Sequence, residues 1–172
     1  KKHAIAEIEE IIVGSKTFSV EDYLDCRVMN LMIKTFYNNS TFEEVYAMLR
    51  AINVSPFDCI LYIKEHSELY SDRINEILAS FAKETTKDLY DTWEKANKFI
   101  LTPEILNKYL GGELGNNELL MHKALMFNEF EDSSNLLFDS VIGSLTEKKL
   151  LTSEFKNYLS ELKLFLSMRK KD

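Results

Sequence analysis

Residues 19–37 read SVEDYLDCRVMNLMIKTFY, a segment with a helix start followed by a long apolar pattern. Ser19 stands three residues before Asp22, and a hydroxyl there can accept a hydrogen bond from the free N–H groups of a first helical turn. The apolar residues that follow point nearly all round a helical axis. They are Cys26, Val28, Met29, Leu31, Met32, Ile33, Phe36 and Tyr37. We therefore expect a helix that is covered on several sides and lies at the centre of the fold.

Three further helix starts are predicted by the same rule. Thr41 precedes Glu44 with the spacing of a capping box. Pro56 and Pro103 each follow a hydroxyl residue and would occupy the first helical position, where the missing N–H of proline costs nothing. Glycines 111 and 112 are expected to end one helix, and Gly143 another.

The composition points to the same fold class. The chain has 172 residues but Gly 5 and Pro 2, too few turn residues for an all-β sandwich or barrel. Residues 1–172 are long enough for one domain that buries roughly two-thirds of its unfolded surface. We expect an all-α domain, an irregular orthogonal bundle of about eight helices.

The N-terminal residues leave two structures open. Residues 4–13 end in a β-branched run before Gly14, which slightly favours a short strand, although the isoleucines in this segment also fit helical spacing. A lone strand needs a partner. Because the chain begins at Lys1, we expect a piece of a longer protein in which residues 1–18 form a strand and turn joined to a missing upstream domain.

Charge and cysteine content narrow the classes of partner. The net charge is −7 with the two signs interspersed, so direct nucleic-acid binding is disfavoured. No apolar run is long enough to span a membrane and no signal peptide is evident, so a cytoplasmic protein without membrane contact is expected. Cys26 and Cys59 are too few for a disulfide framework or a thiolate metal site, and both are expected to be buried.

No motif identifies a catalytic, cofactor-binding or metal-binding residue in this chain. The segment 14–17 lacks the spacing of a phosphate-binding loop. Glu118 and His122 are four apart and are interpreted as a surface ion pair, whereas Cys59 and His66 would leave a metal two ligands short. Aromatic side chains that could line a pocket for a planar ligand are more often core residues. They are Tyr23, Tyr37, Tyr46, Tyr62, Tyr90 and Trp93.

Residues 10–23, EIIVGSKTFSVEDY, resemble a segment of the cobalamin-binding radical SAM proteins. In that family a strand of the form E-I-V-V-x-T-x-T-M-S follows the catalytic barrel and runs into x-E-D-W/Y and a long apolar helix. The likeness ends near residue 40 and departs from the pattern at Gly14 and Phe18. It implies that this chain is the C-terminal helical domain of such an enzyme.

The resemblance has consequences for function and partners. It implies a non-catalytic accessory domain that helps substrate recognition or closes the active site, while S-adenosylmethionine, a [4Fe-4S] cluster and cobalamin bind in the missing upstream part. The upstream domains of the same chain would be its partners, with self-association through the N-terminal strand as a further route. The residues expected to dock between domains are Ile11, Ile12, Val13, Phe18 and Tyr23.

Two other functions stay open. One is a self-contained helical interaction module with an exposed groove for a partner's helix or peptide. The other is a helical sensor that binds a small ligand in a closed aromatic cavity.

Overall fold

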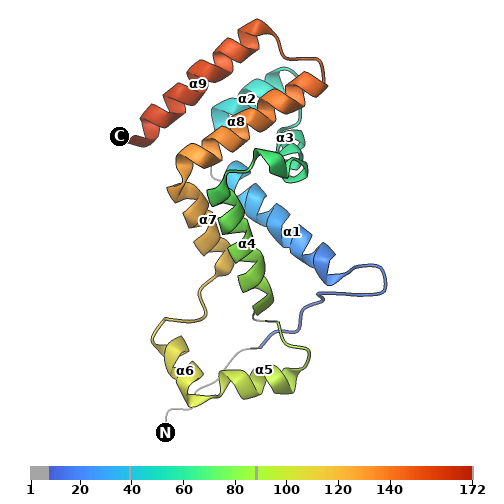
Figure 1. Cartoon of the computed structure of the whole chain (residues 1–172), viewed down its shortest axis with the longest axis vertical. Coiled ribbons are helices and arrows are strands. Elements are labelled where there is room, and N and C mark those ends of the chain that lie inside the picture. The colour runs from blue at the N-terminus through green and yellow to red at the C-terminus, as the bar shows by residue number, and fades with distance from the viewer. Residues whose placement is uncertain (1–7, 39, 88, 172) are drawn as a thin grey trace.

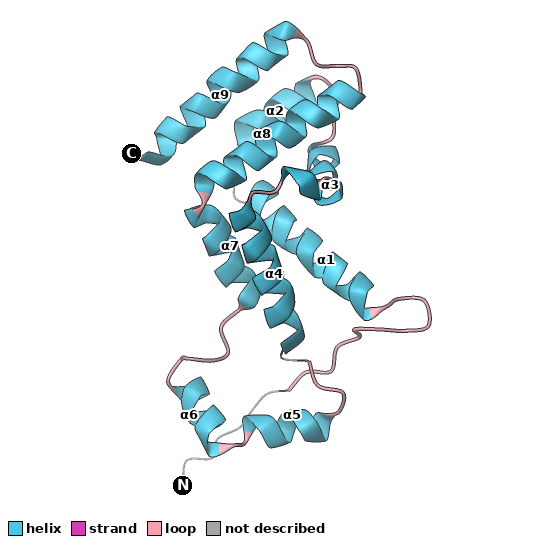
Figure 2. Cartoon of the chain, in the orientation of Figure 1, coloured by secondary structure: helices cyan, strands magenta, loops and turns pink. Residues whose placement is uncertain are grey.

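The computed structural model describes residues 8–38, 40–87 and 89–171, and the regular structure within them is entirely helical (Figure 2). The α-helices are α1 (Val20–Met32), α2 (Glu43–Ala51), α3 (Pro56–Glu65), α4 (Asp72–Lys87), α5 (Trp93–Ile100), α6 (Pro103–Leu110), α7 (Glu118–Asn128), α8 (Phe130–Glu147) and α9 (Ser153–Lys171). A π-helical segment, η1 (Ile33–Tyr37), continues α1, and a 3₁₀ turn, η2 (Ser67–Leu69), follows α3. The expected all-α class is confirmed.

The helices separate into two regions (Figure 1). Helices α1–α4 and α7–α9 form what we call the body, which contains the hydrophobic core. Helices α5 and α6 and the residues 89–92 before them, together with residues 8–13, form what we call the lobe, at the end of the molecule away from α9. The accessible surface of 11264 Å² exceeds the roughly 8,700 Å² expected for a compact protein of 20.0 kDa, so the chain is less compact than an average protein of its mass.

The centre of the body is α8. Helix α8 packs against α3, α4, α7 and α9, and nine of its residues are buried. The helix that begins after Ser19, α1 with η1, packs against α3, α4 and α7 and buries Leu31, Met32, Thr35 and Phe36, so it is covered on several sides, as expected, only in its C-terminal half. Its first turns project away from the core (Figure 1). The apolar side chains in these turns are therefore exposed or only half-buried.

Gly143 lies inside α8 and does not end it, which corrects the predicted helix end. A Cβ atom at this position would lie 2.5 Å from the Tyr62 hydroxyl oxygen, closer than any real contact. The glycine therefore allows the Tyr62 ring of α3 to lie directly against α8.

Two of the predicted helix starts, at Ser19 and Ser55, have the side-chain capping hydrogen bond that was expected. The Ser19 hydroxyl accepts a hydrogen bond from Asp22 N at 3.1 Å, and the Asp22 carboxylate accepts one from Ser19 N at 2.7 Å, which completes a capping box. These bonds hold the pKa of Asp22 below its usual value. Ser55 accepts from Phe57 N at 3.3 Å, with Pro56 in the first turn of α3.

The other two starts differ in detail. Thr41 does not cap α2, whose N-cap is Phe42 without a side-chain hydrogen bond; the Thr41 carbonyl instead accepts from Arg169 of α9 at 2.9 Å. Pro103 begins α6 as predicted, but the Thr102 hydroxyl donates back to the Lys98 carbonyl. The contact between Arg169 and Thr41 joins residues 128 apart, so no sequence pattern near Thr41 predicts it.

The predicted N-terminal strand is not confirmed. Residues 8–13 have neither strand nor helix structure, and residues 4–7 lie outside the described residues. A strand requires a neighbouring strand for its backbone hydrogen bonds, and none of the described segments supplies one.

Candidate functional site

The lobe is the part of the described chain where helices with clear apolar faces bury nothing. Neither α5 nor α6 has a buried residue. The Trp93 side chain is 52% exposed and that of Leu110 is 75% exposed. Within the lobe, Tyr90 packs against Phe99 with ring centroids 5.4 Å apart. The lobe therefore presents an apolar surface that its own residues only partly cover.

A cavity of about 350 Å³ lies between residues 8–13 and α5. Ile11 and Val13 line one wall, and Trp93 and Ala96 line the other. Ile12 does not line the cavity and is 83% exposed. Three of the predicted docking residues thus belong to the lobe, on a segment held beside α5.

The other two predicted docking residues lie elsewhere. Phe18 is half-buried and faces the surface between α1 and α3, and Tyr23 is half-buried in α1 without lining either cavity. The structure therefore does not gather the five predicted docking residues into one surface.

The surface beside Phe18 is a second candidate site, which we call the α1–α3 groove. Two cavities of about 590 and 330 Å³ meet there at Ile33. Phe18 and Leu61 line the larger cavity, and Tyr37 and Phe57 line the smaller one. An ion pair between Lys64 Nζ and Asp25 Oδ2, 2.8 Å apart, joins α3 to α1 beside the larger cavity. The groove is mainly apolar with charged residues along one edge.

The aromatic residues proposed for a planar-ligand pocket are dispersed. Tyr46 is buried in the core and donates to the Phe36 carbonyl at 2.7 Å, and burial raises its pKa. Tyr62 stacks on His66 with ring centroids 3.6 Å apart, and Tyr90 belongs to the lobe. Among the described residues, Tyr90 and Trp93 line the same cavity in the lobe, and the other four aromatic residues lie away from it.

The two cysteines have opposite environments. Cys59 is buried as predicted, and burial raises the pKa of its thiol to about 11. Cys26 is exposed, so the prediction of a second buried thiol is wrong. The error has a physical reason: Cys26 lies in the first half of α1, which projects from the core.

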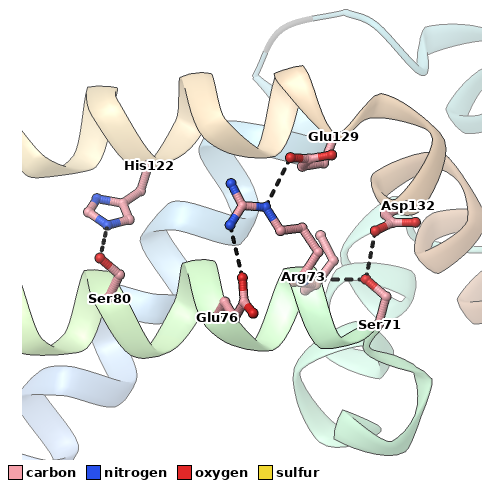
Figure 3. Close-up of polar contacts among 8 residues, drawn as sticks. Ser71, Arg73, Glu76, Ser80, His122, Glu129 and Asp132 are labelled. Atoms are coloured by element: carbon pink, nitrogen blue, oxygen red, sulfur yellow. Dashed lines mark hydrogen bonds and ion pairs between the residues drawn. The ribbon is translucent and has the colours of Figure 1, made fainter.

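Polar side chains join α4 to α7 and α8 along one seam (Figure 3). At its beginning the Ser71 hydroxyl donates to Asp132 Oδ2 at 2.8 Å. Next, Arg73 donates to Glu129 and to Glu76, each at 2.9 Å. Because Arg73 lies in the first turn of α4 and Glu129 follows the last residue of α7, these contacts hold the two helices antiparallel.

His122 is the most buried member of this seam, with 1% of its surface exposed. Its Nδ1 donates to the Glu118 carbonyl at 2.7 Å, and its Nε2 lies 3.2 Å from Ser80 Oγ (Figure 3). The Glu118 carboxylate pairs with Arg27 of α1 instead. The predicted surface ion pair between Glu118 and His122 is therefore wrong, because the imidazole faces the interior and the carboxylate faces α1.

The Ser80–His122 pair has the distance of a nucleophile and its base, but it lacks a place for a substrate. None of the described cavities is lined by either residue. Each ring nitrogen of His122 has a hydrogen-bond partner within the protein, as in a histidine with a structural role. Sequence reasoning missed this pair because its members are 42 residues apart and neither lies in a recognisable motif.

The described residues do not offer the thiolate ligands that the iron–sulfur cluster of the radical SAM family requires. They contain no group of three His, Cys, Asp or Glu side chains placed to hold a metal ion. Cys59 is sealed in the core, and Cys26 has no second thiol beside it. No ligand set for an iron–sulfur cluster is present in this part of the chain.

Comparison with known proteins leaves the family open. No protein-family model, curated protein or solved structure matches the chain. Across the described residues, no helix has both the length and the apolar character needed to cross a membrane.

Proposed function

We propose that this chain is a non-catalytic accessory module that docks onto a larger folded domain through the lobe. The observation that carries the proposal is that α5 and α6 bury no residue although each has a distinct apolar face. An amphipathic helix is stabilised in water mainly by covering that face. A docked domain would supply the missing cover.

The surface area supports an interface of ordinary size. The excess over a compact protein of this mass is about 2,600 Å². A standard protein–protein interface takes about 800 Å² from each partner. The chain as a whole therefore exposes more surface than a compact protein would, by an amount larger than one side of a standard interface.

The resemblance of residues 10–23 suggests the class of partner. It would be the catalytic barrel of a cobalamin-binding radical SAM enzyme, which would hold the iron–sulfur cluster, S-adenosylmethionine and cobalamin. The module would then help substrate recognition or close the active site. Pairing of residues 4–13 with the barrel edge, and the orthogonal arrangement of the body helices, are parts of this same proposal.

The test begins with the gene on the 5′ side of the codon for Lys1. The translated sequence is searched for Cys-x3-Cys-x2-Cys, and the natural full-length protein is compared with residues 1–172 by hydrogen–deuterium exchange. We expect the loop to be present and the amides of residues 8–13 and 89–114 to exchange at least about tenfold more slowly in the full-length protein. A reading frame that starts at Lys1, or unchanged exchange in the lobe, would overturn the proposal.

A second candidate function, a self-contained interaction module, is favoured by the α1–α3 groove. Tyr37 and Phe57 are each about half exposed beside an apolar cavity, which is the form that receives an amphipathic helix. The same exchange experiment separates the two functions. Slower exchange confined to residues 26–37 and 57–64 would favour the groove over the lobe.

A further inference from the structure

A polar cavity of about 420 Å³ lies between the start of α8 and the last turns of α9. These helix ends lie away from the lobe (Figure 1). It differs from the α1–α3 groove because hydroxyl, amide and charged side chains dominate its lining. The lining residues are Asn128, Phe130, Glu131, Ser134, Asn135, Lys163 and Ser167. The helix spacing explains the arrangement, since residues 130, 131, 134 and 135 share one face of α8 and residues 163 and 167 share one face of α9.

Ser134 is the feature of this cavity that packing does not explain. It is 1% exposed, and its hydroxyl oxygen is buried without a hydrogen-bond partner. Two other buried serines of α8 are satisfied: Ser133 donates to the Met126 carbonyl and Ser140 to the Leu136 carbonyl, each at 2.7 Å. A buried hydroxyl that bonds nothing is costly. The hydroxyls of Thr35 and Thr85 are also unpaired, but of the three residues Ser134 is the one that lines a described cavity and so lies beside space for a ligand.

Lys163 supplies a positive charge to the same cavity. Its Nζ lies 5.9 Å from the centre of the Phe138 ring. Among the described residues no carboxylate lies within ion-pair distance of this ammonium, whereas Lys64 and Lys148 of the body are each paired with an aspartate. The Phe138 ring thus holds the Lys163 ammonium near α8. Because no carboxylate of the described residues pairs with this ammonium, its positive charge is available to a ligand.

The backbone N–H groups at the start of α8 add partial positive charge, although the same turn carries the carboxylates of Glu131 and Asp132. No side chain caps this helix, because the Glu129 carboxylate at the N-cap position pairs with Arg73. An uncapped helix start carries partial positive charge and N–H groups that favour anions. Glu131 is the one carboxylate among the lining residues, and it is exposed.

We propose that this cavity binds a small oxyanion, a carboxylate or phosphate group, between Ser134, Asn135 and Lys163. The Ser134 hydroxyl and the Asn135 amide would donate hydrogen bonds, and the Lys163 ammonium would supply the charge. This site is independent of the docking function, because no lobe residue lines it.

The test is a titration of the whole ¹⁵N-labelled chain with sodium acetate and, separately, with inorganic phosphate, at constant ionic strength set by sodium chloride. Backbone NMR shifts are followed at Ser134, Asn135 and Lys163. We expect saturable shifts at these residues with at least one of the two anions, and the anion that saturates at lower concentration identifies the ligand class. Shifts that rise linearly with both anions, or that centre on other residues, would overturn the proposal.

Variants separate binding from folding. Lys163→Met should weaken binding by at least about fivefold and Ser134→Ala by about threefold, since each removes one ligand contact. Lys156→Met, an exposed lysine on the same helix outside the cavity, should change nothing. Ser134→Ala should also raise the melting temperature slightly, because it removes a buried hydroxyl that makes no bond within the protein. Equal affinity in Lys163→Met and the unmodified protein would overturn the proposal.

Discussion

Helices α4 and α5 show how differently the body and the lobe use similar sequences. Both have a strongly apolar face and an acidic first turn. Helix α4 buries Ile74, Ile77 and Phe81 between α1 and α7, whereas α5 buries no residue. An apolar stripe therefore predicts that a helix forms, but the structure around it determines whether the stripe is covered.

The difference also separates two levels of stability. The body has a continuous core from α1 to α9, so its helices should unfold together. The lobe has few buried contacts, so it should open locally at low free-energy cost. Each of the following predictions tests this separation.

The largest effect is expected from removing one aromatic side chain in each region. Phe138→Ala should destabilise the protein by about 3–5 kcal/mol, because Phe138 is 1% exposed at the centre of α8. Trp93→Ala should change the unfolding free energy by less than about 1 kcal/mol, because more than half of the indole is exposed. Urea unfolding followed by circular dichroism measures both. Equal losses would show that the lobe belongs to the cooperative core.

Alkaline pH should destabilise the body through Cys59. Because the pKa of this thiol is about 11 in the folded protein and near 9 when unfolded, its contribution to stability is present below pH 9 and is lost as the pH rises towards 11. The loss should be on the order of 2 kcal/mol for about two pKa units. Urea unfolding at pH 8 and pH 10.5 measures it. Cys59→Ala should remove this part of the pH dependence and Cys26→Ser should not, while Tyr46 and Tyr70, whose pKa values burial also raises, should keep the rest.

Gly143→Ala tests the close contact between α8 and α3. The added methyl group would meet the Tyr62 ring, so we expect a loss of about 1 kcal/mol after allowing for the better helix propensity of alanine. In a Tyr62→Leu background the same substitution should stabilise the protein by a few tenths of a kcal/mol up to about 1 kcal/mol. Thermal unfolding of the four proteins gives both values. The same sign in both backgrounds would contradict the contact.

The smallest effect compares one helix cap in each region. Ser19→Ala removes the capping box of α1 and should cost about 1 kcal/mol of global stability. Thr92→Ala removes the bond from Lys95 N to the Thr92 hydroxyl at 3.3 Å, which starts α5. It should speed amide exchange within α5 but leave the global unfolding free energy unchanged. A global loss in both variants would contradict the independence of the lobe.

The sequence predicted where helices begin better than it predicted which residues and helices are buried. Ser19, Pro56 and Pro103 marked true helix starts because capping depends on residues within one turn. Burial depends on the partner across the fold, so Cys26 was misplaced inside and the role of α8 was missed. A serine-rich helix such as α8 is not recognised as central from its sequence. The hydroxyls of Ser133 and Ser140 are buried because they donate hydrogen bonds to backbone carbonyls, and no sequence pattern reveals those bonds.

The candidate sites were predictable to a smaller extent. Ile11 and Val13 do line a cavity, yet the opposite wall is formed by Trp93 and Ala96, about eighty residues later in the chain. The oxyanion cavity requires α8 and α9 to cross at one point, and Ser134 attracts no attention in the sequence. Such sites depend on tertiary geometry, which one sequence without relatives does not specify.

The antiparallel pairing of α4 and α7 has a consequence for how the chain can vary. The seam from Arg73–Glu129 to Ser80–His122 already closes these helices into a hairpin, so the segment between them is an insertion at the hairpin tip. Each doubling of a connecting loop costs only about 0.6 kcal/mol in closure entropy. The inserted helices α5 and α6 can therefore lengthen, shorten or be exchanged while the hairpin beneath them keeps its register.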